Sequence, residues 1–237
     1  MSHDLVPERY RGVWSRTLLE TPTHRDDTSL VLWMQTDLWH ADLRIPPAAR
    51  LDRVKAPLSA LSAAQLQALT LQSGFCGITQ VERRSPLEDE VCTWHRHADY
   101  QPTGLMPDAG WMVFETDDRV IETGVHGLYR EVWERLPNST GDFSVQLLHE
   151  GADHAGATRL LTAGRYVMRV RPRQAQWPAD TALGDTLSEV LARHPDQALS
   201  LLDFEVSFGV RDGQSDAKHW TILHSTLPEL ASQTPAA

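Results

Sequence analysis

Two histidines, His95 and His97, begin the part of the sequence that is richest in chemically active side chains. Alternate residues of a β-strand project to the same side, so both imidazoles would face the same way, a spacing common among metal ligands. β-Barrel metal sites that use such a pair add a glutamate a few residues further on, but here Asp99 follows instead. His126 or His149 would complete a site only through contacts that the spacing does not specify. The pattern favours two exposed histidines, and we predict neither a metal nor a cofactor.

Asp99 is followed directly by Tyr100 and by a loop rich in proline and glycine. Together with His95, these residues offer a base, an acid and a phenol, which are the groups that general acid–base catalysis uses. Nothing in their spacing brings the three together, so we assign no catalytic residues. A barrel-based hydrolase, isomerase or cyclase that uses His95, Asp99 and Tyr100 stays an alternative. The sequence holds no nucleophilic-serine motif, phosphate-binding glycine loop or dinucleotide fingerprint.

Trp94 and Arg96 occupy the other side of the same predicted strand. An arginine among aromatic residues can stack on a ring in the wall of a pocket. Glu82 and Glu115, on neighbouring predicted strands, would be its ion-pair partners. Such a buried pair is either structural or contacts a polar group of a ligand.

A second polar group, His40, Asp42 and Arg44, alternates with apolar residues on one strand. If this face points into a cavity, Arg44 would bind a carboxylate or a carbonyl group of a ligand. The alternative is a solvated outer face of the sheet.

The charge of the chain limits its partners. Acidic residues outnumber basic residues 32 to 22, which argues against nucleic acid or an anionic membrane surface, because both require a cationic face. The N-terminus lacks an apolar run like that of a signal peptide, and no stretch is long and apolar enough to span a membrane. Cys76 and Cys92 are then expected to be reduced, packed thiols of a cytoplasmic protein, with a disulfide or a reactive thiol as alternatives.

The apolar pattern predicts an all-β protein in which short strands alternate with turns. Strands are predicted at residues 9–16, 30–34, 38–45, 75–83, 91–97, 111–116, 119–123, 128–135, 143–149, 157–162, 165–171, 201–211 and 218–225. One amphipathic helix is predicted after Ser62, which forms a capping-box pattern with Gln65, and a second from about residue 182 to residue 193.

The heptapeptide at residues 10–16 is similar to the one at residues 129–135, with five of seven positions identical. The same order of strands, helix and strands follows each copy. We therefore predict two halves, residues 1–125 and 126–230, followed by a disordered tail at 231–237. A single β-sandwich is the alternative.

Gly12-Val13-Trp14 resembles the Gly-x-Trp motif that opens many lipocalin-like (calycin) barrels, in which the Trp plugs the closed end. The stretch at residues 28–46, together with residues 94–96 and 99–102, resembles a family of uncharacterised two-barrel, lipocalin-like proteins that includes a yeast casein-kinase-interacting protein. The resemblance implies two lipocalin-like antiparallel β-barrel halves, each with one short amphipathic helix, and no known reaction. Glu131 departs from the motif in the second copy, and lipocalins place their helix after the barrel strands. A ligand class therefore does not follow from the resemblance.

We predict that the first half binds a small, partly apolar ligand that carries a polar or acidic group. The predicted ligand-binding residues are Trp14, Trp33, Gln35, Arg44, Glu82, Trp94, Arg96, Tyr100, Trp111 and Glu115. The second half would be structural or would mediate a homodimer. Two alternatives stay open: an interaction protein whose barrels are filled by side chains, and a haem protein with His149 or His224 as axial ligand.

Overall fold

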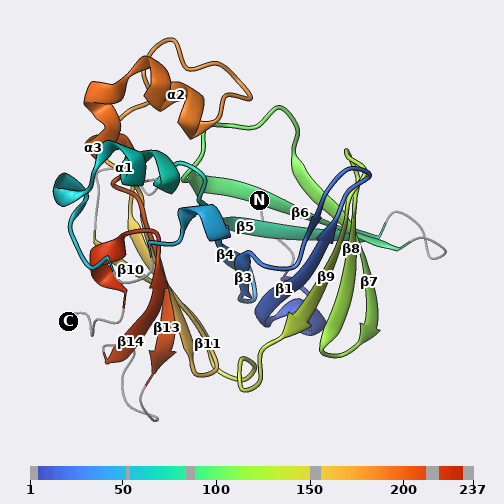
Figure 1. Ribbon diagram of the computed structural model, residues 1–237. Helices are drawn as coiled ribbons and strands as arrows, with labels where there is room; N and C mark the ends of the chain where they lie inside the picture. Colours follow the sequence, from blue (N-terminus) through green and yellow to red (C-terminus); the bar gives the residue numbers. More distant parts are fainter. Residues whose placement is uncertain (1–4, 52–53, 84–88, 150–155, 212–218, 232–237) are drawn as a thin grey trace.

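The computed structural model describes residues 5–51, 54–83, 89–149, 156–211 and 219–231 (Figure 1). It contains a closed eight-stranded antiparallel barrel and a five-stranded antiparallel sheet that packs beside it. The prediction of an all-β fold is confirmed. None of the helices in the described part of the chain is long and apolar enough to cross a membrane.

The barrel is formed by consecutive strands that close because the last pairs with the first. Its strands are β1 (Gly12–Glu20), β3 (Leu30–Gln35), β4 (Trp39–Ile45), β5 (Ser73–Arg83), β6 (Glu90–Asp99), β7 (Asp108–Thr116), β8 (Arg119–Gly124) and β9 (Arg130–Arg135). A short strand, β2 (Arg25–Asp26), pairs with the end of β1. Strand β9 pairs with β8 on one side and with β1 on the other.

The second sheet has the order β10-β11-β12-β13-β14. Its strands are β10 (Phe143–His149), β11 (Thr158–Ala163), β12 (Tyr166–Arg171), β13 (Glu205–Arg211) and β14 (Trp220–Ser225). Among the described residues β10 does not pair with β14, so closure into a second barrel is not confirmed. Strand β9, predicted to open the second half, belongs instead to the first barrel, and the change of sheet falls between Arg135 and Phe143.

Short helices lie near one end of the contact between the two sheets (Figure 1). The α-helices are α1 (Ala63–Leu69), α2 (Leu187–Arg193) and α3 (Ala198–Leu202), and the 3-10 turns are η1 (Glu8–Tyr10), η2 (Pro47–Ala49), η3 (Leu58–Ala60), η4 (Pro195–Gln197) and η5 (Pro228–Leu230). Ser62 caps α1 as predicted, and Thr186 caps α2 in the same way, so α2 begins later than residue 182. Residues 201 and 202, predicted as the start of a strand, belong instead to α3.

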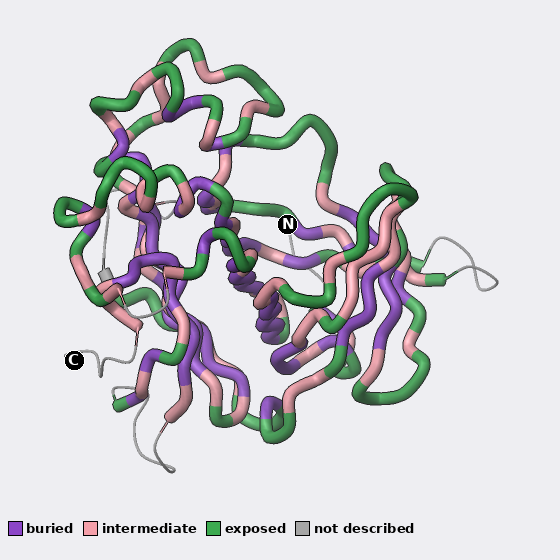
Figure 2. The backbone as a smooth tube through the Cα atoms, in the orientation of Figure 1, coloured by how far each residue is buried: buried purple, intermediate pink, exposed green. Residues whose placement is uncertain are grey.

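Alternation along β3 and β4 builds a core on each side of the barrel wall. Leu32, Met34 and Leu43 face outward and share one buried cluster with residues of the second sheet such as Val206. Trp33 faces inward with the other large side chains of the barrel. Buried segments therefore run through the middle of the molecule in Figure 2.

Trp14, near the start of β1, packs at one end of the barrel against the N-terminal turn η1. Trp14 is fully buried, donates a hydrogen bond from Nε1 to the carbonyl oxygen of Tyr10 at 2.7 Å, and stacks on Trp33. Gly12 has a φ of 135°, a conformation that strains other residues, and a Cβ there would meet Ser139 Oγ at 3.0 Å.

Candidate functional site

A cavity of about 330 Å³ occupies the barrel beyond the Trp14 end. It is lined by Arg16, Leu19, Thr21, Trp33, Asp42, Arg44, Phe75, Trp94, Asp108, Glu122, Tyr129, Glu131 and Trp133. Leu19 and Thr21 are partly exposed, whereas Trp33, Asp42 and Glu122 are buried. The site is thus an aromatic chamber into which charged groups project.

Three tryptophans form the apolar wall. The ring of Trp33 meets Trp94 at 5.5 Å and Trp133 at 5.9 Å between centroids, both edge to face. All three are at most 7% exposed. Interlocked rings of this kind hold a rigid wall, because each ring fixes the rotamer of the next.

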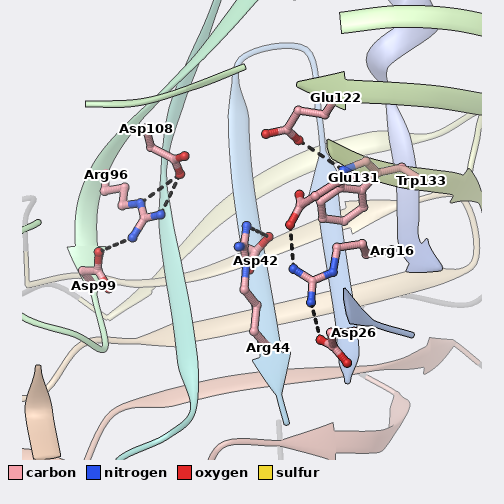
Figure 3. Close-up of polar contacts among 10 residues, drawn as sticks. All are labelled: Arg16, Asp26, Asp42, Arg44, Arg96, Asp99, Asp108, Glu122, Glu131 and Trp133. Carbon is pink, nitrogen blue, oxygen red and sulfur yellow. Dashed lines mark hydrogen bonds and ion pairs between the residues drawn. The ribbon is translucent and has the colours of Figure 1, made fainter. Parts of the chain in front are cut away.

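Arg16 forms the first charged cluster, on the strands that close the barrel (Figure 3). It lies two residues after Trp14 on β1 and so projects to the same side. Its guanidinium binds Glu131 at 2.6 Å and Asp26 at 2.8 Å, and the side chain is 7% exposed. One buried cation is therefore shared by two carboxylates.

Arg44 and Asp42 form the second cluster. Both Asp42 oxygens accept hydrogen bonds from Arg44, at 2.7 and 3.3 Å. Burial is the largest single effect and acts to lower the pKa of Arg44, but the charges of Asp42, Glu131 and Asp108 and the hydrogen bond to Asp42 together raise that pKa well above its usual value. The face that carries His40, Asp42 and Arg44 is thus internal, and the alternative of a solvated outer face is wrong.

Arg96 forms the third cluster at the edge of the chamber (Figure 3). It binds Asp99 at 2.8 Å and Asp108 at 2.6 Å, and its guanidinium carbon lies 3.6 Å from the centroid of the Phe75 ring. The predicted stacking of this arginine is confirmed. Burial raises the pKa of Asp99, although Arg96 acts in the opposite direction.

The glutamates predicted as partners of Arg96 lie elsewhere. Glu82 accepts a hydrogen bond from Gln80 at 2.6 Å on the exposed part of β5. Glu115 pairs with Arg119 at 2.7 Å on the surface. Their placement in the ligand site is therefore wrong, since neither lines the cavity.

Glu122 is one of three buried acids of the chamber, together with Asp42 and Glu131. Its Oε1 accepts a hydrogen bond from the Tyr129 hydroxyl at 2.7 Å, and its Oε2 accepts one from Trp133 Nε1 at 3.1 Å. Burial, then the negative charge of Glu131, raises its pKa well above the usual value. Gly110 makes room for it, because a Cβ at that position would lie 2.5 Å from Glu122 Cγ.

Gln35 supports the wall of the chamber without lining it. Its Oε1 accepts hydrogen bonds from the Thr79 hydroxyl at 2.7 Å and from Trp33 Nε1 at 3.3 Å. His40 Nδ1 lies 3.0 Å from Thr79 Oγ1, and burial lowers the pKa of this histidine well below its usual value. His40 therefore donates from Nδ1 as a neutral imidazole, and its Nε2 is buried without a hydrogen-bond partner among the described residues.

Three of the predicted aromatic site residues also lie outside the chamber lining. Trp14 packs at the barrel end against Tyr10 and Trp33, as described above. Tyr100 is fully buried in the core between the two sheets, where its hydroxyl donates to the Leu69 carbonyl oxygen at 3.0 Å and its ring meets Phe204. Trp111 is half-buried and alternates with the inward-facing Met112.

The side chains of the alternative catalytic set point to different partners. His95 Nε2 lies 3.1 Å from Gln80 Oε1 on an exposed face, Asp99 binds Arg96, and Tyr100 binds Leu69. The three therefore form no common site.

The histidine pair is equally unsupported as a metal site. His97 packs edge to face on Trp39. Within the described ranges, no three His, Cys, Asp or Glu side chains gather where they could hold a metal ion.

His224, one alternative haem ligand, stacks on Phe208 in the second sheet. It borders a second hollow of about 500 Å³ between the sheets, which is lined mainly by apolar residues such as Leu30 and Ile45. The side chain of His149 lies outside the described residues, as do residues 232–237 of the tail predicted at 231–237.

Comparisons with known proteins bear on the fold. No protein-family model matches the sequence, and no curated protein matches it. Among solved structures, the chain is similar to the crystal structure of the uncharacterized protein YLR301w from Saccharomyces cerevisiae. The TM-score is 0.53 at 14% identity, covering 90% of this chain and 84% of that one. The similarity extends to the fold alone and agrees with the β-barrel part of the predicted resemblance. Membership of the lipocalin-like family stays a prediction.

Several residues of the chamber were not predicted from the sequence. They are Arg16, Asp26, Phe75, Glu122, Tyr129, Glu131 and Trp133. A signal was present for two of them, because Glu122 shares a strand face with the buried Val120, and Glu131 shares one with Trp133. A charged residue on the apolar side of an alternating strand marks an inward-facing polar group.

Proposed function

We propose that this protein binds a small, partly apolar molecule with a polar group in the barrel cavity. The observation that carries the proposal is the cavity itself, because about 330 Å³ of space lies between tryptophan rings and converging charged side chains. Ligand pockets of about 300 to 1,000 Å³ have this composition of apolar wall and few polar groups. Trp33, Trp94 and Trp133 would contact the apolar part of the ligand.

The polar part of the ligand would contact carboxylates rather than arginines. Arg44 and Arg96 were predicted to bind the ligand directly, and each of them already binds at least one carboxylate in the protein. We therefore place them as groups that hold Asp42 and Asp108 in position at the wall. A barrel filled by side chains, which the interaction-protein alternative requires, is disfavoured by the same cavity.

Native mass spectrometry of freshly purified protein, beside a denatured run of the same sample, tests the proposal. We expect a mass excess that disappears on denaturation. The variant Leu19→Trp, which fills the cavity from its partly exposed lining, should lose that excess. Leu128→Trp is the matched control, since Leu128 is 82% exposed and does not line the cavity.

Two results would count against the proposal. One is a mass excess that Leu19→Trp retains, which would place the ligand elsewhere. The other is a bare polypeptide mass combined with unchanged tryptophan fluorescence across a panel of small aromatic and aliphatic compounds, since three tryptophans line the chamber.

A further inference from the structure

The charges around the cavity do not balance (Figure 3). Three guanidinium groups face six carboxyl groups. The cations are Arg16, Arg44 and Arg96, and the carboxyl groups belong to Asp26, Asp42, Asp99, Asp108, Glu122 and Glu131. Among the residues that line the cavity itself, with a proton on Glu122, the carboxylates Asp42, Asp108 and Glu131 still stand against the two cations Arg16 and Arg44, and the balance stays negative.

Unmatched negative charge is unfavourable where water is excluded, and three of the carboxyl groups are shielded from water. The side chain of Asp42 is 2% exposed, that of Glu131 is 6% exposed, and Glu122 is 4% exposed as a residue. An anionic ligand would add to the repulsion, whereas a cationic ligand would relieve it. No described lining residue other than Arg16 and Arg44 carries a positive charge into the cavity.

The aromatic wall also favours a positively charged ligand. The face of a tryptophan ring attracts an ammonium group within about 6 Å, and the attraction grows when water is excluded. Trp33, Trp94 and Trp133 line the same cavity as the carboxylates. A bare metal ion would use neither the rings nor this volume, and no three potential metal-ligating side chains converge in the described part of the chain.

We infer that the ligand of the barrel cavity is a protonated organic amine, with its ammonium group against the carboxylates and its apolar part against the tryptophans. This inference rests on the proposed function, whose ligand it specifies. It reverses the charge of the acidic group that the arginines led us to expect from the sequence.

Three compounds of similar shape and different charge test the inference: phenethylamine, 2-phenylethanol and 3-phenylpropionate. Their affinities for the full chain are measured by titration calorimetry at pH 7 and by quenching of tryptophan fluorescence. We expect phenethylamine to bind about tenfold more tightly than the alcohol, and 3-phenylpropionate to bind most weakly.

Asp108→Asn removes one carboxylate from the cavity edge and keeps its shape. Asp108 is 25% exposed as a side chain, so the variant is expected to fold. It should weaken phenethylamine binding about threefold or more and leave 2-phenylethanol binding unchanged. Asp117→Asn, in the exposed turn between β7 and β8, is the matched control and should change neither affinity.

The outcomes separate the inference from the proposed function. Preference for the amine, reduced in Asp108→Asn and kept in Asp117→Asn, supports both. Equal or tighter binding of the alcohol or the acid overturns the amine inference and leaves cavity binding intact. Binding of none of the three compounds overturns the cavity function and the inference with it.

Discussion

Arg16 on β1 and Glu131 on β9 form an ion pair of 2.6 Å across the two strands whose pairing closes the barrel. The side chains are 7% and 6% exposed, and both residues line the cavity. The contact that joins the first and last barrel strands is therefore also a wall of the candidate site. A change that alters the site at this point also alters the closure of the barrel.

Arg16→Ala should destabilise the protein strongly. The substitution leaves the buried carboxylate of Glu131 and the partly buried carboxylate of Asp26 without their cation, and breaking a buried ion pair costs about 3 to 5 kcal/mol. Urea unfolding followed by tryptophan fluorescence measures the loss. Arg119→Ala is the control, because Arg119 pairs with exposed glutamates and its removal should cost about 1 kcal/mol or less. Equal losses in the two variants would contradict the structural role of Arg16.

Glu122→Gln should change how stability depends on pH. Burial and the charge of Glu131 raise the pKa of Glu122 in the folded chain above its value in the unfolded chain. Between those two pKa values the folded state holds a proton that the unfolded state has lost. The stability of the wild type therefore falls as pH rises from the unfolded pKa to the folded pKa. Glutamine stays neutral, and Tyr129 can accept a hydrogen bond from its amide.

The gain of Glu122→Gln over wild type should therefore grow as pH rises from about 5 to 8. Urea midpoints at several pH values in that range measure it. Glu115→Gln, which removes an exposed carboxylate on β7, is the control. Parallel curves for wild type and Glu122→Gln would show that Glu122 is not held protonated.

Gly12→Ala should destabilise the closed end of the barrel. Alanine at a φ of 135° is strained, and its Cβ would press on Ser139 Oγ at 3.0 Å, so we expect a loss of about 1 to 3 kcal/mol. Gly104→Ala should be nearly neutral, because the nearest heavy atom to a Cβ there is a carbonyl oxygen at 4.0 Å. Thermal unfolding of both variants compares them, and a neutral Gly12→Ala would mean that this end adapts freely.

Both cysteines should be unreactive in the folded protein. Cys76 and Cys92 are free and buried, and burial raises the pKa of Cys76 to about 12 and that of Cys92 well above its usual value. A thiol reagent such as Ellman's should label neither at pH 8 in the native state and both in denaturant, because the thiolate is the reacting form. Rapid labelling of one thiol without denaturant would overturn this expectation.

The alternation of residues sufficed to predict most strands, but it left open which face of β4 points into the barrel. The register between strands did not follow from it, because a period of two constrains which side a residue faces and not which partner it meets. Arg96 illustrates the point. A bulge at Cys76 and Gly77 shifts β5 against β6, so Arg96 lies opposite Gly77, whereas Glu82 lies opposite Val91 at the other end.

The two similar heptapeptides are neighbours in the fold, although they lie far apart in the sequence. They form β1 and β9, which lie antiparallel, so that Trp14 is opposite Arg135 and Arg16 is opposite Trp133. The Arg135 guanidinium also lies 4.5 Å from the Trp14 ring. The two similar segments are therefore neighbouring strands of one barrel. The site residues contributed by β9 were missed for this reason.

The pairing of β1 with β9 has a consequence for synthesis of the chain on the ribosome. The first strand emerges early but stays unpaired on one edge until residue 135 has left the exit tunnel, so barrel closure is a late, long-range event. Even then the outward side chains Leu32, Met34 and Leu43 lack their cover, since the second sheet supplies it. A nascent chain stalled at this length would have a closed barrel whose apolar outer side is exposed to water. Chaperones bind exposed apolar surfaces of this kind.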